Sequence, residues 1–285
     1  MSIVYLNGEF LPVERATVSV LDRGFLFGDG IYEVIPVYGG RLFRLPQHLQ
    51  RLQQSLEGIR LQNPLSHAEW GALFREAVAR NGGGDLSMYL QVTRGFVAKR
   101  DHAFPATATP TILVMTNPLP RRPNPPGVSA IVARDIRWDL CHIKAITLLP
   151  NTLLRQEAIE AGASEAILVR HGVVTEGAAS NVFVVSGGRV ATPAKGTQIL
   201  PGITRDLVVE LLHEAGIGCE ERVVTIDELR AADEVWLTAA TREVAPVVRL
   251  EGAPVGTGAP GPVWKAVDDL YQDYKRRVRE GLVEN

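Results

Sequence analysis

The sequence has few of the features that mark secreted, membrane-spanning or metal-binding proteins. Only two of its 285 residues are cysteine, Cys141 and Cys219, too few for a disulfide framework or a cysteine-based metal site. No apolar run approaches the length of a membrane span. The first residues, MSIVYLNGEF, lack the basic start and the long apolar stretch of a signal peptide. We therefore expect a soluble, metal-free protein of a reducing compartment, the cytoplasm.

The sequence also lacks an excess of charge of either sign. Its 30 basic and 32 acidic residues leave a net charge of −2, so overall charge favours neither nucleic acid nor an anionic membrane as a partner. A hydrophobic content of 46% is ordinary for a globular protein. At 285 residues the chain has the size at which one core usually becomes two, so we expect two domains.

The first 117 residues combine strand and helix patterns. Asn7-Gly8 supplies the positive φ of a tight turn and predicts a hairpin over residues 3–11. From Pro46, leucines recur at steps of four and three, which predicts an amphipathic helix. The other elements expected here are strands near 31–38, 41–45, 88–93 and 111–116 and a helix over 67–80.

A proline-rich stretch, PLPRRPNPPG at residues 118–127, divides the chain. Its five prolines and lack of apolar periodicity are typical of a semi-rigid connector. We therefore expect an N-terminal α/β domain at 1–117 and a C-terminal α/β domain, a pseudo-barrel, at 128–285. The elements expected in the second domain are strands 128–134, 166–170, 181–185, 234–238 and 244–250 and helices 151–161, 205–215 and from Pro262 onward.

Two ionisable residues of the second half stand among apolar ones. Lys144 lies within the run CHIKAITLL, and Glu176 lies in a Thr-Glu-Gly turn. A buried lysine without a partner is so costly that it is paired, deprotonated or used covalently. Covalent use means Schiff-base chemistry with a carbonyl, including that of pyridoxal phosphate. Taken singly, a lysine that reaches water from a strand edge and a solvated turn acid are the commoner structures.

A pyridoxal phosphate enzyme needs a lysine, a partner for the pyridine nitrogen and an anion site for the phosphate. Lys144 and Glu176 fit the first two requirements. LPGITR fits the third, because it places Ile203 and Thr204 at a helix N-terminus, although Thr204 as an ordinary N-cap is by itself the commoner case. Arg51 lies beside the leucine stripe, where its side chain either covers apolar surface or reaches a phosphate.

Three further residues are candidates for binding a substrate. The loop Arg100-Asp101-His102 offers two nitrogen donors for a carboxylate, or is simply a solvated charged loop. Tyr32 is either a strand residue or part of a pocket wall. We interpret His142 as a structural residue near Lys144.

Several motifs together resemble the class IV aminotransferases of PLP fold type IV. They are RGFLFGDGIYEV, QHLQRL, VTRGFVAKRDHAFP, CHIKAITLLPN, VTEGAASNVF and LPGITRD, which occur in the family's order over nearly the whole chain. Within that class the sequence is most similar to the D-amino-acid (D-alanine) aminotransferases, because Arg100 and His102 share one loop. The resemblance implies a two-domain α/β (α+β) fold with the cofactor, pyridoxal 5′-phosphate, between the domains.

The resemblance also implies a role for each candidate residue. Lys144 matches the Schiff-base lysine that moves the substrate proton, and Glu176 matches the partner of the pyridine nitrogen. The phosphate contacts match Arg51 and the backbone N–H groups of Ile203 and Thr204, and Leu200 matches the leucine against the cofactor ring. The carboxylate trap matches Tyr32, Arg100 and His102, the last two contributed by the partner subunit of a homodimer.

The implied reaction is transfer of an amino group between D-amino acids and 2-oxo acids such as 2-oxoglutarate or pyruvate. Alternatives on the same fold are an R-selective amine transaminase, a branched-chain L-amino-acid aminotransferase and aminodeoxychorismate lyase, and a more distant one is a cofactor-free binding protein. Ala179, Ala239 and Ala240 stand where close relatives carry hydroxyl residues, which removes hydrogen-bond donors. We expect nearby Arg242 to be an exposed surface residue.

Overall fold

The computed structural model describes residues 2–119 and 127–283, and its contacts divide the chain into two compact units. The first unit contains the chain up to Leu119, residues 143–147 and the chain from Arg276 onward. Of the described residues, the second unit contains those from Gly127 to His142 and from Leu148 to Lys275. Most of the predicted connector, residues 120–126, lies outside the described residues. The segment that carries Lys144 thus packs with the first unit, although both of its flanks belong to the second.

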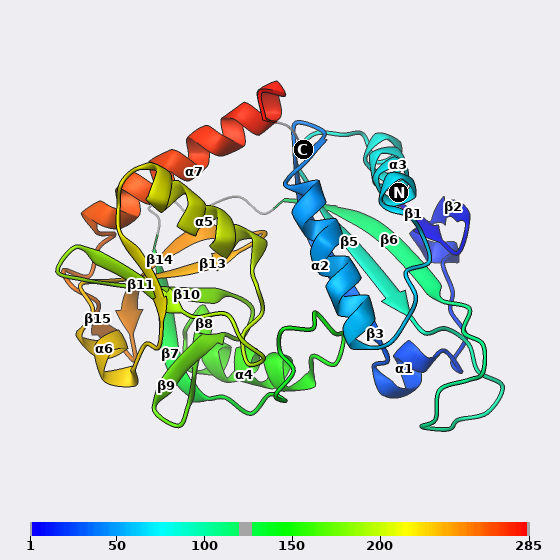
Figure 1. Ribbon diagram of the computed structural model, residues 1–285, viewed down its shortest axis with the longest axis horizontal. Coiled ribbons are helices and arrows are strands. Elements are labelled where there is room, and N and C mark those ends of the chain that lie inside the picture. The colour runs from blue at the N-terminus through cyan, green and yellow to red at the C-terminus, as the bar shows by residue number, and fades with distance from the viewer. Residues whose placement is uncertain (1, 120–126, 284–285) are drawn as a thin grey trace. The chain divides into compact units, whose positions relative to one another are not determined.

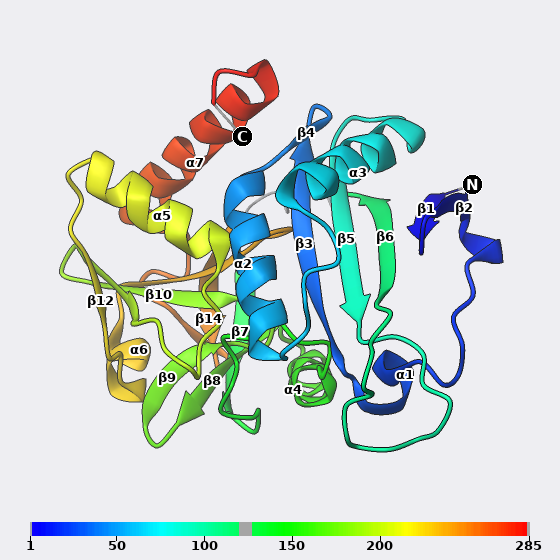
Figure 2. The same ribbon diagram turned by 45° about the vertical axis from the view of Figure 1, so that its right-hand side comes forward.

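A six-stranded antiparallel sheet forms the centre of the first unit (Figure 1). Its order is β2-β1-β6-β5-β3-β4, and the long helices α2 and α3 cover one face (Figure 2). The strands are β1 (Ile3–Leu6), β2 (Glu9–Pro12), β3 (Gly30–Tyr38), β4 (Arg41–Leu42), β5 (Leu86–Thr93) and β6 (Thr111–Pro118). The helices are α1 (Arg23–Phe27), α2 (Leu45–Gly58) and α3 (His67–Arg80), with a 3₁₀ turn at Val13–Arg15.

Local sequence explains most of these elements. Asn7 and Gly8 take φ values of 50° and 106°, which confirms the predicted turn of the β1–β2 hairpin. The leucines of α2 are buried against β3, as their spacing predicts. Helix α3 begins with a capping box, in which Ser66 Oγ accepts from the backbone of Glu69 and the Glu69 carboxylate accepts from the backbone of Ser66.

Helix α1 occupies a glycine-rich stretch for which the sequence predicts no helix. Asp22 caps it by accepting a hydrogen bond from the backbone N–H of Gly24 at 2.7 Å. Gly28 ends it in the left-handed region, with φ of 67°. Asp22 also accepts from Thr93 Oγ1 at 2.8 Å, so the short helix is fixed to the end of β5.

A mixed nine-stranded sheet forms the second unit. Its order is β12-β11-β10-β13-β14-β7-β8-β9, with β15 paired to β14, and β7 runs parallel to both of its neighbours. The strands are β7 (Val128–Arg134), β8 (Glu165–Arg170), β9 (Val173–Gly177), β10 (Asn181–Ser186), β11 (Arg189–Pro193), β12 (Cys219–Arg222), β13 (Glu234–Ala239), β14 (Glu243–Leu250) and β15 (Ala253–Pro254). The helices are α4 (Leu149–Glu160), α5 (Ile203–Glu214), α6 (Ile226–Ala231) and α7 (Pro262–Glu280).

Two local expectations are wrong in ways that matter for the site. Glu176 lies within β9 rather than in a turn, because Val173–Gly177 pairs with β8. Thr204 is not the cap of α5: Gly202 is the N-cap residue and makes no side-chain cap, and Thr204 belongs to the first helical turn. No helix within the described residues is long and apolar enough to cross a membrane.

Candidate active site

Lys144 lies in the loop between β7 and α4, fixed through its backbone. Its N–H donates to Ser55 Oγ at 3.2 Å, and its carbonyl accepts from the backbone N–H of Tyr32 at 2.9 Å. One isolated bridge joins Ala145 to Ile31, so the segment runs beside β3 without forming a strand. Both polar groups of the Lys144 backbone are therefore satisfied, which fixes where the side chain starts.

Two glycines allow this segment to lie close to its neighbours. A Cβ on Gly30 would stand 2.7 Å from the Val92 carbonyl oxygen and 3.0 Å from Ile146 Cδ1. A Cβ on Gly58, at the end of α2, would stand 2.8 Å from side-chain carbons of Ile143. Ile143 is itself part of the buried core of the first unit. A larger residue at Gly30 would clash with the backbone of β5 and touch Ile146, and one at Gly58 would clash with Ile143, so either change would disturb the packing around Lys144.

The amine of Lys144 lies against an aromatic face. Its Nζ is 4.1 Å from the centroid of the Tyr32 ring, a cation–π distance, and the side chain is half-buried. Tyr32 stacks on Tyr89, whose hydroxyl donates to Gln91 Oε1 at 2.7 Å. Burial raises the pKa of Tyr89 to about 12, so this phenol stays protonated. Within the described residues no carboxylate pairs with Lys144 Nζ.

Arg51 forms a buried ion pair with Glu33. The guanidinium donates from Nε to Oε1 at 2.7 Å and from Nη2 to Oε2 at 2.8 Å, and His48 Nδ1 lies 2.8 Å from Oε2. Burial alone would raise the pKa of Glu33, but Arg51 and His48 hold it well below its usual range. Burial lowers the pKa of His48, and the charges of Arg51 and Lys144 lower it further. The ion pair thus lies within the electrostatic reach of Lys144.

Arg100 and His102 are exposed on a loop whose backbone accepts hydrogen bonds from a buried arginine, Arg23. Arg23 donates to the backbone carbonyls of Asp101 at 2.7 Å and His102 at 3.2 Å. The Phe27 ring of α1 lies between the two candidates, 4.8 Å from the Arg100 guanidinium and 5.2 Å from the His102 ring. In the described part of one chain, no hydrogen bond, ion pair or ring contact joins either residue to Tyr32 or Lys144.

Glu176 lies in the second unit with only 4% of its surface exposed. Its Oε1 accepts from Arg137 Nη1, and its Oε2 accepts from Asn181 Nδ2 at 3.1 Å and from the backbone N–H of Leu200 at 3.0 Å. Burial raises the pKa of Glu176 to about 7, although Arg137 acts in the opposite direction. The carboxylate is therefore oriented by three donors and titrates near neutrality.

The sequence does not predict that Arg137 is buried beside Glu176. It stands in ARDIRWD, a charged stretch that reads as a solvated turn, yet its side chain is only 5% exposed. The Asp135 carboxylate accepts two hydrogen bonds from the Arg137 guanidinium, from Nε at 3.0 Å and from Nη2 at 2.9 Å. The only signal is that this Asp-x-Arg pair follows directly after the apolar strand β7.

Helix α5 presents its N-terminus beside the Glu176 carboxylate. The Leu200 carbonyl accepts from Asn181 Nδ2 at 2.9 Å, which links this chain segment to the partners of Glu176. Ile203 and Thr204 form the buried first turn, and no side chain caps the helix. The free N–H groups and the dipole of a twelve-residue helix favour an anion at this end.

A buried hydroxyl on β13, that of Thr238, also indicates that a polar group binds near this site. Thr238 stands directly opposite Asn181 in the β10–β13 pair, so the two side chains share a face of the sheet. Thr238 is 1% exposed, and its Oγ1 has no hydrogen-bond partner among the described residues. An unpaired buried hydroxyl is unusual, and a bound polar group would satisfy it.

The environment of Arg242 differs from the expectation. Its side chain is 28% exposed, and its Nη1 lies 3.1 Å from an oxygen of the fully buried Glu165. Its Nη2 also donates to the Ser164 carbonyl at 3.1 Å. The prediction of an exposed surface arginine is therefore wrong, because a buried carboxylate that the sequence does not reveal draws the guanidinium inward. Ala239 ends β13 and Ala240 follows it in the turn before Arg242, and both are half-exposed.

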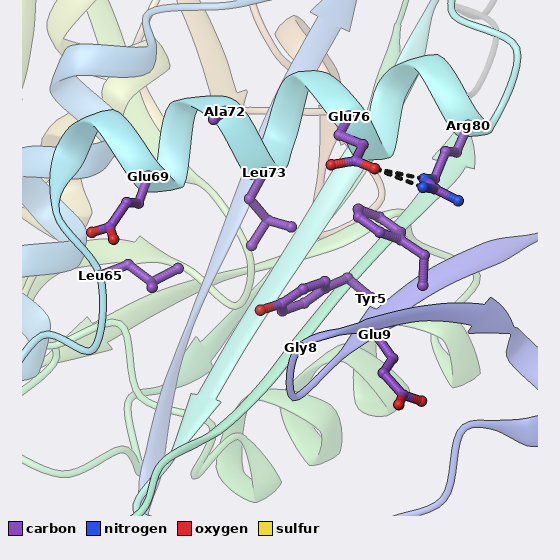
Figure 3. A pocket seen from close by; sticks show the side chains of 10 residues that line it. Tyr5, Gly8, Glu9, Leu65, Glu69, Ala72, Leu73, Glu76 and Arg80 are labelled. Carbon is purple, nitrogen blue, oxygen red and sulfur yellow. Dashed lines mark hydrogen bonds and ion pairs between the residues drawn. The ribbon is translucent and has the colours of Figure 1, made fainter.

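A separate groove lies between the β1–β2 hairpin and α3 (Figure 3). It has a volume of about 650 Å³ and an apolar floor that includes Tyr5, Phe10 and Leu73. Arg80 closes one side, where it pairs with Glu76 at 2.7 Å and lies 4.4 Å from the Phe10 ring centroid. None of the predicted site residues lines this groove.

Comparison with known proteins gives consistent results. Residues 30–250 match the family model for amino-transferase class IV. The chain is 44% identical over 272 residues to a D-alanine aminotransferase of Bacillus licheniformis, which covers 95% of this chain and 96% of the relative. It is 38% identical over 279 residues to a D-alanine aminotransferase of Staphylococcus aureus, with 96% and 98% covered.

The solved structures with the same fold include branched-chain aminotransferases. One from the archaeon Thermoproteus uzoniensis, solved with norvaline, superposes with a TM-score of 0.87 at 28% identity, covering 98% of this chain and 96% of its own. One from Escherichia coli gives a TM-score of 0.86 at 28% identity, with 94% and 92% covered. A third such enzyme, solved with pyridoxamine 5′-phosphate, has a TM-score of 0.90 at 27% identity, with 96% and 93% covered.

Proposed function

The chain belongs to the class IV aminotransferases, and on that premise we propose that it transfers the amino group of D-amino acids to 2-oxo acids. D-Alanine is the donor that we propose, and 2-oxoglutarate or pyruvate the acceptor. The observation that carries this choice is the 44% identity to a D-alanine aminotransferase over nearly the whole of both chains. The solved branched-chain enzymes share the fold at 27–28% identity and support the reaction type rather than the substrate.

The cofactor is pyridoxal 5′-phosphate, which when bound supplies a carbonyl carbon for the amino group and an electron-withdrawing ring. The residues present suit it. The uncapped N-terminus of α5 and the unpaired hydroxyl of Thr238 suit a phosphate dianion. The buried carboxylate of Glu176 suits a ring N–H. Lys144 suits covalent attachment, because no carboxylate of the described chain pairs with its amine.

Each of these residues then has a definite task. Lys144 Nζ holds the cofactor covalently at rest, and during turnover takes the proton from the substrate α-carbon and later returns it. Glu176 accepts the hydrogen bond of the ring nitrogen and favours its protonated form. Leu200 would pack against the ring when the cofactor is bound. Arg51, oriented by Glu33, joins the backbone N–H groups of Ile203 and Thr204 around the phosphate.

We propose that the protein works as a homodimer in which Arg100 and His102 complete the site of the other subunit. In the described part of one chain, no hydrogen bond, ion pair or ring contact joins them to Tyr32, the third residue of the proposed carboxylate trap. Large apolar side chains are exposed on α1 and the two loops beside it, with Phe25 72%, Phe96 58% and Phe104 52% exposed. Burying this group against a second subunit would remove apolar surface from water.

A donor panel tests the proposal enantiomer by enantiomer. Purified protein with pyridoxal phosphate should use D-alanine with 2-oxoglutarate and form pyruvate and D-glutamate. The alternatives predict activity with L-leucine or (R)-1-phenylethylamine instead, and either result without D-alanine turnover would refute the proposed substrate. Borohydride reduction followed by peptide mass spectrometry should place the cofactor on Lys144, and Lys144→Ala should show no such adduct. Size-exclusion chromatography with light scattering tests the dimer.

The cytoplasm is the location that we propose. Both cysteines, Cys141 and Cys219, are free thiols, which suits a reducing compartment. Burial raises the pKa of each thiol to about 11, so neither is a reactive thiolate at neutral pH.

A further inference from the structure

The donors around Glu176 leave one acceptor position on a particular oxygen. A carboxylate has about four lone-pair positions, two on each oxygen. Asn181 and the Leu200 backbone N–H together fill Oε2, at 3.1 and 3.0 Å. Arg137 Nη1 fills one position of Oε1, and these are the only donors to Glu176 in the described chain. The remaining position is therefore on Oε1, next to a guanidinium.

Arg137 is itself held in a fixed orientation. Its Nε and Nη2 form a fork with the two oxygens of Asp135, and its Nη2 also donates to the Gln198 carbonyl at 3.2 Å. Asp135 is in turn fixed by Thr175 Oγ1 at 2.9 Å and by Arg170 Nη2 at 3.3 Å. The Nη1 group therefore reaches Glu176 with little freedom to rotate, so it sets the plane of that carboxylate.

The charges around Glu176 act in opposite directions. Burial raises its pKa, the positive charge and hydrogen bond of Arg137 lower it, and the negative charge of Asp135 raises it. Cys141 also faces the pair, but as a neutral thiol because burial raises its own pKa to about 11. Among these groups Arg137 is the one cation in direct contact with Glu176. An opposite charge in contact lowers the pKa of a carboxyl by about 1–3 units.

We propose that Arg137 is a positioning residue, which favours the ionised form of Glu176 and turns its carboxylate so that one lone pair of Oε1 faces the ring nitrogen of the cofactor. The inference rests on the proposed function, because it takes Glu176 as the partner of that nitrogen. Arg137 does not touch the cofactor in this arrangement. It acts only through the charge and orientation of Glu176.

The ionisation of Glu176 can be measured in the full-length protein after removal of the cofactor. Carbon-13 NMR of protein labelled at the glutamate carboxyl carbon follows the titration, and Glu176→Gln identifies the resonance. Arg137→Met should move the midpoint upward by about 1–3 pH units. Asp135→Asn should move it downward, because it removes a nearby negative charge while Arg137 remains. Local disorder would not shift the two variants in opposite directions.

The double variant Asp135→Asn/Arg137→Met covers the case in which the single arginine variant does not fold. It removes both members of the buried pair together, so no uncompensated aspartate remains. Its Glu176 midpoint should lie above that of the native protein, because contact with Arg137 outweighs the more distant Asp135. An unchanged midpoint in Arg137→Met, or shifts of the same sign in Arg137→Met and Asp135→Asn, would overturn the proposal.

Cofactor affinity separates this proposal from the function on which it rests. At pH 7.5, Arg137→Met should weaken binding of pyridoxal phosphate about tenfold or more, and Arg137→Lys should restore part of the loss through its charge. Arg230→Met is the control, since Arg230 pairs with Glu251 at the surface and contacts neither Glu176 nor Arg137. If the native protein binds no pyridoxal phosphate, the proposed function fails and this inference with it. If native and Arg137→Met bind it equally, only this inference fails.

Discussion

The guanidinium of Arg51 meets the carboxylate of Glu33 with two parallel hydrogen bonds, 2.7 Å from Nε to Oε1 and 2.8 Å from Nη2 to Oε2. Arg51 comes from α2 and Glu33 from β3, so the pair joins a helix to the sheet beneath it. Glu33 is 1% and Arg51 5% exposed. Because both charges are buried, each depends on the other to remain in the core.

Glu33→Gln should therefore lower the free energy of unfolding at pH 7 by about 3–5 kcal/mol, since it removes the carboxylate charge that pairs with the buried guanidinium of Arg51. Surface Glu76 pairs with Arg80 at about half exposure, so Glu76→Gln should cost at most about 1 kcal/mol. The pKa of Glu33 is lowered, so its contribution is present above its unfolded value and is lost as pH falls through the lowered pKa. Urea unfolding at several pH values measures both variants, and equal costs would contradict the account.

Arg100→Ala should raise the KM for D-alanine about tenfold or more and leave the cofactor absorbance unchanged. The reason is that the proposed trap loses its guanidinium, while no residue that holds the cofactor changes. Lys99→Ala is the control, because Lys99 is exposed on the same loop and has no assigned role. Steady-state kinetics with D-alanine and 2-oxoglutarate measure the effect. Equal KM values for the two variants would remove Arg100 from the trap.

Gly30→Ala should displace the Lys144 segment. A Cβ at this position would lie 2.7 Å from the Val92 carbonyl oxygen, closer than real contacts allow, and 3.0 Å from Ile146 Cδ1, which is a tight contact. We expect a lower melting temperature and at least a tenfold loss of the Lys144 adduct rate with pyridoxal phosphate. Gly196→Ala is the control, since nothing lies within 4 Å of a Cβ there. A native-like adduct rate in Gly30→Ala would show that the segment adapts.

Glu176→Gln should change the pH dependence of stability in the cofactor-free protein. Burial raises the pKa of Glu176 from 4.5 to about 7. Between these values the folded chain holds a proton that the unfolded chain has released, so native stability falls as pH rises through this window. The difference at pH 8 is on the order of 3 kcal/mol in favour of Glu176→Gln, and it should vanish near pH 4.5. Denaturant unfolding at pH 5 and 8 tests this, and parallel curves would contradict it.

Thr238→Val should stabilise the cofactor-free protein by about 1 kcal/mol, because it removes a buried hydroxyl that has no partner in the described chain. The same change should weaken binding of pyridoxal phosphate if the hydroxyl faces the phosphate. Thr192→Val is the matched contrast: Thr192 is equally buried, but its Oγ1 donates to the Val182 carbonyl at 2.7 Å. That variant should be destabilised. Thermal unfolding with and without cofactor separates the two.

Regular elements could be predicted wherever local chemistry determines them. The Asn7-Gly8 turn and the leucine stripe of α2 follow from backbone freedom and from helical spacing, and the structure confirms both. Short strand β12 could not be predicted in the same way, because its partner β11 lies on the far side of helix α5 in the sequence. Glu176 was expected in a turn since Thr-Glu-Gly reads as one, yet pairing with β8 makes it a strand residue.

The site was predictable as a set of residue types but not as a set of contacts. Lys144 and Glu176 could be singled out because each interrupts an apolar run. Arg137 and Glu165 could not, because a charged residue that is buried by long-range packing has the same local sequence as one on the surface. The ion pair of Arg51 with Glu33 also escapes local reasoning, since it joins elements whose packing is tertiary.

The path of the chain has a consequence for any attempt to divide the protein. The chain passes between the two units four times, after Leu119, His142, Thr147 and Lys275. A cut within residues 120–126 would therefore not release two self-contained pieces. The C-terminal fragment would still carry two pieces that belong to the first unit. One is the Lys144 segment, residues 143–147, which forms part of the core of that unit, and the other is the end of α7 from Arg276 onward. Such fragments should recover structure only when mixed, as complementary halves of one fold.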